Sequence, residues 1–148
     1  MDCDLSISGL SYTQVKSLLD AAKEDFATFT ESFIEEYAQK LSTYASFVTL
    51  RNEKGDITGI IAFYSNQKPT AYISHIWVAG CNRGGGACGK MIAMLSEYVK
   101  GKGFNAIKLE VRLNNRSAIR AYEKNGFKFI SRNGESGYMI KSLSHNIC

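Results

Sequence analysis

Residues 83–90 read Arg-Gly-Gly-Gly-Ala-Cys-Gly-Lys and set a run of glycines between two cations. They follow an apolar segment that ends at Val78 and precede a segment with helical periodicity. Glycines let a backbone approach a ligand closely, and the first N–H groups of a helix lack intrahelical acceptors. These donors and the positive end of the helix dipole favour a phosphate or pyrophosphate. The segment therefore predicts an anion-binding turn to which Arg83 and Lys90 add charge.

Two common nucleotide motifs fit this segment poorly. A P-loop needs Ser or Thr after its lysine, but Met91 follows Lys90. Gly84, Gly86 and Gly89 have the Rossmann spacing, but a Rossmann unit opens a βαβ repeat, and here several predicted strands come first. The glycines alone also suit a flexible helix start that binds nothing.

A second motif downstream indicates which phosphate ligand the glycine-rich turn binds. Leu109-Glu110-Val111 is followed over residues 115–127 by N-x-x-A-I-x-x-Y-E-K-x-G-F. Together with R-x-x-G-x-C from Arg83 to Cys88, these residues resemble the GNAT superfamily of acyl-CoA-dependent N-acetyltransferases. The resemblance covers residues 57 to 130, and the N-terminal part matches only in its pattern of elements.

The resemblance implies a fold and an activity. The fold is α+β (α/β by some schemes), with a mixed, mostly antiparallel sheet, the order β-α-α-β-β-β-α-β-α-β-β and splayed central strands. The activity is N-acetyl transfer with acetyl-CoA as co-substrate, and residues 1–148 form a single acetyltransferase domain.

The resemblance also assigns residues to the cofactor and to catalysis. The strand end at Ile76, Trp77 and Val78 polarises the thioester and faces pantetheine, and Tyr122 is the general acid. The remaining cofactor-binding residues are Arg83, Gly84, Gly85, Gly86, Ala87, Cys88, Gly89, Lys90 and Asn115. Cys88 stands where Gly or Ala is usual, so its side chain is expected close to the phosphates.

Two of these residues have a structural alternative. If Gly126 ends the helix as its C′ residue, Tyr122 and Phe127 are the pair that touches in a Schellman cap, so Tyr122 also serves as a core aromatic. Asn115 is suited to cap the helix start as well as to contact the cofactor.

The general base stays open. Residues 70–78 contain no carboxylate, and His75 is the only group there with a pKa near neutrality. Regular alternation puts Tyr72, Ser74, Ile76 and Val78 on one face, and Ile73, His75 and Trp77 on the other, unless a bulge re-aims His75. His75 is therefore expected to be structural. Tyr72 or Ser74 through water, and the acids Glu24, Asp25 and Glu31, are the other candidates.

The acceptor is read from residues 23–33, which mix phenylalanines with acids. Acids suit a cationic amine and aromatics suit a sugar or apolar face, so we expect a small-molecule amine, such as an amino sugar. Three alternatives remain: an acyl-CoA-binding module without turnover, acetylation of a protein N-terminus or lysine, and acetylation of aminoacyl-tRNA.

Composition limits the classes of partner. The chain has 148 residues, a net charge of +4 and 45% hydrophobic residues, typical of one soluble globular domain. The charge is too small and too dispersed to favour nucleic acid, and no apolar run could span a membrane. The four cysteines have no metal-ligand spacing, so we expect free thiols in the cytoplasm and no metal site. A homodimer is left open.

The elements that position these residues follow from periodicity and caps. Ser11 and Gln14 form a capping box, with Leu10 and Val15 as a hydrophobic staple, before a first helix that runs to Phe26. Thr28 starts a second helix, residues 87 onward form a third, and a fourth begins after Asn114 or Asn115. Strands are expected at 4–7, 47–51, 57–64, 71–78, 106–111, 127–131 and 138–141, with a hairpin at Asn133-Gly134.

Overall fold

The computed structural model describes residues 4–22, 30–79 and 86–143. The elements follow in the predicted order: β1 (Asp4–Ser8), α1 (Tyr12–Ala22), α2 (Glu31–Tyr44), β2 (Ser46–Arg51), β3 (Ile57–Tyr64), β4 (Thr70–Val78), α3 (Ala87–Gly101), β5 (Ala106–Arg112), α4 (Arg116–Lys124), β6 (Phe127–Asn133) and β7 (Ser136–Ser142). Most strands extend the predicted ranges by one or two residues, because their cross-strand pairing continues into the turns.

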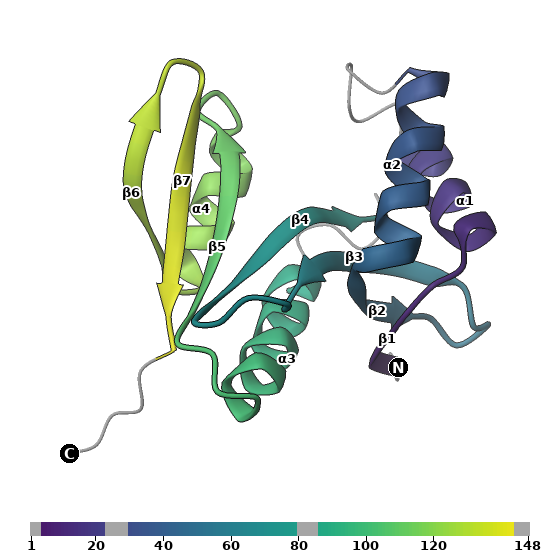
Figure 1. Ribbon diagram of the computed structural model, residues 1–148, viewed down its shortest axis with the longest axis horizontal. Coiled ribbons are helices and arrows are strands. Elements are labelled where there is room, and N and C mark those ends of the chain that lie inside the picture. Colours follow the sequence, from purple (N-terminus) through teal and green to yellow (C-terminus); the bar gives the residue numbers. More distant parts are fainter. Residues whose placement is uncertain (1–3, 23–29, 80–85, 144–148) are drawn as a thin grey trace.

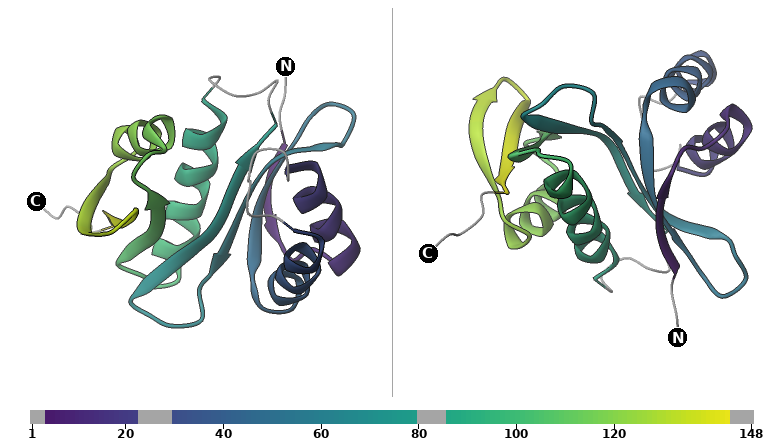
Figure 2. Two further views of the ribbon diagram at one scale, coloured as in Figure 1. Left: turned by 90° about the horizontal axis from the view of Figure 1, so that it is seen from above. Right: turned by 60° about the horizontal axis from the view of Figure 1, so that its bottom comes forward.

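The described strands form a seven-stranded sheet in the order β1-β2-β3-β4-β5-β7-β6. Every neighbouring pair is antiparallel except β4 and β5, which are parallel. Helices α1 and α2 cover one face, and α3 and α4 lie on the other (Figure 2). Two buried clusters result: one beneath α1 and α2 around Leu19, Ile34 and Phe47, and a larger one beneath α3 around Ile61, Phe63 and Leu95.

Local signals set the helix ends. Ser11 and Gln14 exchange the two hydrogen bonds of a capping box, at 3.0 and 3.2 Å, and Leu10 and Val15 are both buried beside it. The expected helix start at Thr28 lies outside the described residues. Helix α2 begins at Glu31, and its N-cap is Thr30, whose hydroxyl accepts from the Phe33 N–H at 3.2 Å.

The parallel pair at the centre of the sheet is short. Residues 70–73 of β4 pair with residues 106–109 of β5, and the described remainders of the two strands do not pair. The strands diverge there and the sheet opens into a V (Figure 1). This opening confirms the expected splay of the central strands.

A β-bulge interrupts β4 where the opening begins. Ile73 is opposite Phe63 and His75 is opposite Ala62, so Ser74 is the extra residue on β4. The bulge reverses the side-chain alternation beyond it, so the face assignment based on regular alternation is wrong for residues 75–78. His75 faces the α1–α2 side together with Tyr72, whereas Ile76 and Val78 pack against the α3 cluster with Ile73.

Candidate active site

Helix α3 lies on the face of the sheet opposite α1 and α2, and its first turn is close to the end of α4 (Figure 2). Its N-cap is Gly86 with φ of +84°, a left-handed conformation that glycine adopts without strain, and a Cβ there would meet nothing within 4 Å. Intrahelical bonding begins with the Lys90 N–H on the Gly86 carbonyl at 3.1 Å. The amides of the first turn therefore point out of the helix end as donors for an anion. The predicted anion-binding turn also includes Arg83, Gly84 and Gly85, which lie outside the described residues.

Two residues of this first turn face inward. Cys88 packs against the α3 cluster close to Tyr122, and burial raises the pKa of its thiol. Its side chain thus has room among apolar neighbours. At Gly89 a Cβ would lie 3.0 Å from the Asn125 Oδ1, so glycine there lets the end of α4 approach α3. Gly89 has a packing role besides the backbone contact expected of it.

Helix α4 carries Tyr122 and begins at a capped end. The Asn115 side chain is the N-cap and accepts from the Ala118 N–H at 3.3 Å. The helix ends at Lys124, and Gly126 follows in the left-handed conformation with φ of +98°, as expected of a C′ residue. Tyr122 packs on Phe127 at the helix end. Burial raises the pKa of Tyr122, and the nearby Cys88 adds to the effect, so the phenol is protonated at neutral pH.

The predicted thioester-binding residues lie on β4 beyond the last pair with β5. Ile76 and Val78 pack toward α3, and Trp77, opposite Ile60 of β3, points to the other face. The strand edge that they form borders the opening of the sheet, on the side of β4 away from β3.

His75 lies on the α1–α2 side of β4 but is buried. Only 8% of its surface is exposed, and its ring meets the Tyr37 ring edge-on at 6.1 Å between centroids. Burial lowers the pKa of His75 to about 4. Its imidazole is then a weak base at neutral pH. The reason given for a structural role, regular alternation, is wrong, because the bulge turns His75 to the face of Tyr72.

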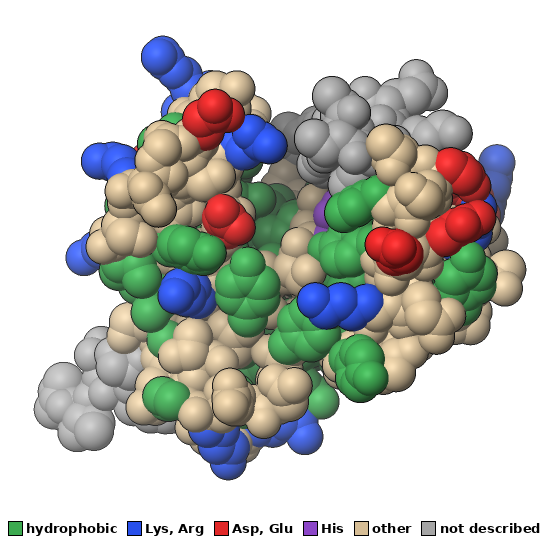
Figure 3. All heavy atoms as spheres, turned by 45° about the horizontal axis from the view of Figure 1, so that its top comes forward, with side chains coloured by type: hydrophobic (Ala, Val, Ile, Leu, Met, Phe, Trp, Pro, Cys, Tyr) green, Lys and Arg blue, Asp and Glu red, His purple; other side chains and the backbone are tan. Residues whose placement is uncertain are grey.

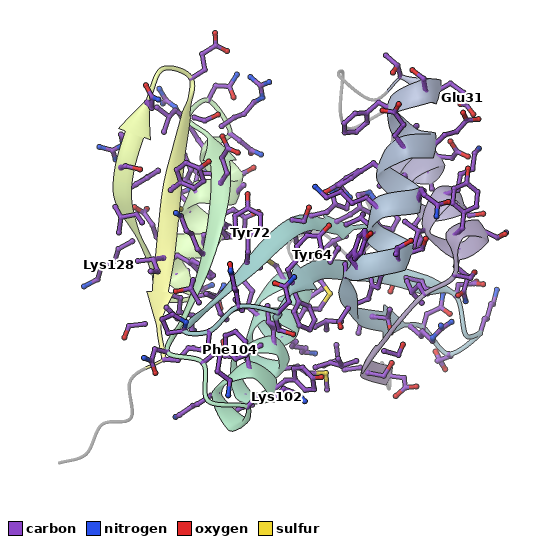
Figure 4. All side chains as sticks on the ribbon, in the orientation of Figure 1. Glu31, Tyr64, Tyr72, Lys102, Phe104 and Lys128 are labelled. Atoms are coloured by element: carbon purple, nitrogen blue, oxygen red, sulfur yellow. The ribbon has the colours of Figure 1, made fainter. Side chains whose placement is uncertain are left out.

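Four tyrosines and one carboxylate gather on the face opposite α3, and we call them the tyrosine cluster: Tyr37, Tyr64, Tyr72, Tyr138 and Glu110. Burial raises the pKa of Tyr72, and the charge of Glu110 raises it further. Tyr72 stands between β5 and α2, with Tyr64 nearer to α2 (Figure 4). This face is hollowed between the two halves of the molecule, with hydrophobic side chains at the floor of the hollow (Figure 3).

Glu110 is the functional candidate that sequence reasoning missed. Ile107, Leu109 and Val111 of β5 are buried under α3, so Lys108 and Glu110 point to the other face. Glu110 is opposite Tyr138 of β7, and the Lys108 ammonium lies 4.6 Å from the Tyr138 ring centroid. The alternation of β5 was the available signal, but the predicted candidates for the general base lay only on β4 and in residues 24–31.

Of the acids expected near the acceptor, Glu31 lies within the described residues, and it faces α1. The Glu31 carboxylate pairs with the Lys16 ammonium at 3.3 Å, toward α1, and Glu24 and Asp25 lie outside the described residues. Phe33 is 40% exposed and its ring lies 5.3 Å from that of Tyr37. Helix α2 therefore presents aromatic rings, not Glu31, at this end of the tyrosine cluster.

Within residues 4–22, 30–79 and 86–143, no three His, Cys, Asp or Glu side chains come together as a metal site. None of the helices in these ranges is long and apolar enough to cross a membrane.

Comparisons with known proteins agree with this geometry. The model of the Acetyltransferase (GNAT) family matches residues 14–127, more than half of the chain. No curated protein matches the sequence.

Solved structures share the fold. A GNAT-family acetyltransferase from Staphylococcus aureus Mu50 has 16% identity, covers 97% of this chain and 100% of its own, and has a TM-score of 0.80. PaiA N-acetyltransferase from Thermoplasma acidophilum, in complex with coenzyme A, has 19% identity, coverages of 94% and 99%, and a TM-score of 0.76. Nourseothricin acetyltransferase has 23% identity, coverages of 68% and 66%, and a TM-score of 0.60.

Proposed function

The chain belongs to the acetyltransferase (GNAT) family, and on that premise we propose that it transfers an acetyl group from acetyl-CoA to the primary amine of a small molecule. The acyltransferase activity and the CoA co-substrate follow from the family. The acceptor and the roles of individual residues are our proposal.

The start of α3 would hold the pyrophosphate of the cofactor. The amides of Ala87, Cys88 and Gly89 precede the first intrahelical bond, and the open space at Gly86 leaves room for a ligand to approach them. Lys90 adds a positive charge in the same turn. Acetyl-CoA, when bound, supplies an acyl group activated as a thioester, and residues 76–78 of β4 border the opening that would take it.

Tyr122 is suited to protonate the leaving sulfur. It packs beside Cys88 near the start of α3, and burial keeps its proton in place at neutral pH. The same burial disfavours a lasting phenolate, so Tyr122 must regain a proton once it has given one up. The reaction then balances: the acceptor ammonium loses two protons, one restores the thiol by way of Tyr122 and the other leaves to solvent.

The acceptor proposal depends on the tyrosine cluster. Its one carboxylate, Glu110, projects from β5 on the face of Tyr72, where it can hold an ammonium and take its proton. Burial raises the pKa of Tyr64 and Tyr72, so both phenols are neutral at pH 7 and offer rings and hydroxyls to a sugar or another apolar body. Glu110 beside Tyr72 is the observation that supports an amine acceptor on this side.

A thiol-release assay tests the proposal. Acetyl-CoA is supplied with an amino sugar, an arylalkylamine, an alkyl polyamine, a peptide with a free N-terminus and aminoacyl-tRNA, and free CoA is measured with a thiol reagent. We expect the amino sugar or arylalkylamine to give the highest kcat/KM. Faster acetylation of the peptide or the tRNA would overturn the acceptor class. A thermal shift with acetyl-CoA but no release with any amine would instead identify a binding module.

A further inference from the structure

The Tyr37 hydroxyl of α2 makes two hydrogen bonds to the bulged residue of β4. It donates to the Ser74 carbonyl at 3.0 Å and lies 2.6 Å from the Ser74 Oγ. A phenol has one proton, so the Ser74 hydroxyl donates in the second bond. A helix of the acceptor side is therefore joined by hydrogen bonds to the strand that borders the cofactor opening.

Ser74 lies where β4 leaves β5 and changes its side-chain alternation. Ile73 forms the last pair with β5, and Ser74 is the extra residue that turns the strand beyond it. Without the bulge, His75 would point into the apolar α3 cluster in place of Ile76. The direction of residues 75–78 thus depends on keeping Ser74 in its bulged position.

The Tyr37 ring is held so that its hydroxyl has one direction. The Phe33 ring lies on one side at 5.3 Å, and the His75 ring meets it edge-on at 6.1 Å. Burial raises the pKa of Tyr37 to about 12, so the donor proton is present across the physiological range. Ring packing fixes the position of the hydroxyl and the two hydrogen bonds fix Ser74.

From this geometry we propose that Tyr37 is a positioning residue for acyl transfer, acting through Ser74 to hold the part of β4 that borders the cofactor opening in register with α2. Tyr37 does not act on the reacting atoms. The proposal rests on acyl transfer at the opening of the sheet and is independent of which amine is the acceptor.

The test compares Tyr37→Phe with a matched control. Tyr37→Phe keeps the ring between Phe33 and His75 and removes only the hydroxyl. Ser6→Ala removes another partly buried hydroxyl pair, Ser6 Oγ to Thr49 Oγ1 at 2.9 Å, between β1 and β2. With the most active amine of the panel, we expect Tyr37→Phe to lower kcat by about 10- to 100-fold, because small misplacements of reacting groups cost that much. The KM for acetyl-CoA should change by less than about twofold. Ser6→Ala should retain the kcat of the parent.

Double substitution shows whether Tyr37 works through Ser74. Ser74→Ala alone should lower kcat less than Tyr37→Phe, because the bond to the Ser74 carbonyl remains. Adding Ser74→Ala to Tyr37→Phe should lower kcat no further, because the shared interaction is already lost. Independent, multiplying effects of the two substitutions would overturn the proposal, as would a loss of kcat in Ser6→Ala equal to that in Tyr37→Phe.

A second measurement needs no acceptor, so it separates this proposal from the acceptor proposal. Coenzyme A should slow amide hydrogen exchange both in residues 74–78 and, through Tyr37, in residues 31–44 of α2. In Tyr37→Phe the slowing in residues 74–78 should remain and that in α2 should be lost. The positioning role would be contradicted if coenzyme A slowed amide exchange in α2 equally in the two proteins, or if it did not slow exchange there in the parent.

Discussion

The Tyr122 and Phe127 rings lie 5.9 Å apart between centroids across the end of α4, at an interplanar angle of 58°. The contact anchors the Tyr122 ring by packing, while its hydroxyl carries the function proposed for it. A substitution that keeps the ring and removes the hydroxyl of Tyr122 can therefore distinguish its packing role from its catalytic role.

We expect Tyr122→Phe to fold like the parent and to lose catalysis. The ring contact with Phe127 remains, so the Tm and the acetyl-CoA affinity should change little. The proton donor is lost, so kcat should fall by about 10²- to 10⁴-fold. Single-turnover kinetics are needed, because slow product release would mask the change.

Tyr98→Phe is the matched control for this substitution. Tyr98 of α3 also packs on a phenylalanine, with its ring 5.9 Å from that of Phe63. It should keep the single-turnover rate of the parent. An unchanged rate in Tyr122→Phe would return Tyr122 to a packing role alone.

Gly86→Glu should abolish the thermal shift that acetyl-CoA gives. A ligand selective for the native state raises the Tm by mass action, and the added carboxylate would repel the pyrophosphate at the start of α3. Gly55→Glu is the control, because Gly55 has a similar φ of +87°, equally open surroundings and a place on the β2–β3 turn. Both variants carry the same backbone strain and charge, so only Gly86→Glu should lose the shift. An undiminished thermal shift in Gly86→Glu would refute the anion-binding role of the turn at the start of α3.

Glu110→Gln should weaken use of the amine without weakening binding of acetyl-CoA. The substitution keeps the shape of the side chain and removes its charge and basicity, so kcat/KM for the best amine should fall by about 10²-fold or more. The control is Glu53→Gln on the exposed β2–β3 turn, which should match the parent. Parent-like kcat/KM in Glu110→Gln would exclude Glu110 as the amine-binding carboxylate.

His75 should make stability fall as the pH falls from about 6.5 to 4. The unfolded chain protonates His75 near its ordinary pKa of 6.5, whereas the folded protein resists protonation down to about 4. The unfolded state therefore binds more protons in this window, and the free energy of unfolding drops by about 3 kcal/mol. The free energy of unfolding, measured with urea at several pH values, should fall less steeply with falling pH in His75→Gln than in the parent.

The same variant tests the catalytic role of His75. If His75 is structural, the pH–rate profile of folded His75→Gln keeps its position. Loss of an ionisation near neutral pH from that profile, with folding intact, would instead make His75 the base.

Much of the fold and part of the candidate site were predictable because they depend on local chemistry. The capping box at Ser11 and Gln14, the cap at Asn115 and the glycine at position 126 satisfy backbone groups within a few residues along the chain. The glycine at position 86, at the start of α3, is likewise a local feature, because glycine adopts φ of +84° without strain. Short-range rules such as these fix element order and the position of Tyr122 beside Phe127.

The acceptor side depended on contacts between distant segments. Alternation along residues 70–78 misplaced residues 75–78, because the bulge at Ser74 exists only in the pairing of β4 with β3. Ser74 is also bonded to Tyr37, which is 37 positions away. Glu110 lies near Tyr72 because β4 and β5 are paired neighbours in the sheet, and that pairing is not evident from either strand alone. The sequence by itself determined which groups were available and the local geometry of each cap and turn. The tertiary structure decided which of those groups face one another, because strand register and burial are properties of the assembled sheet.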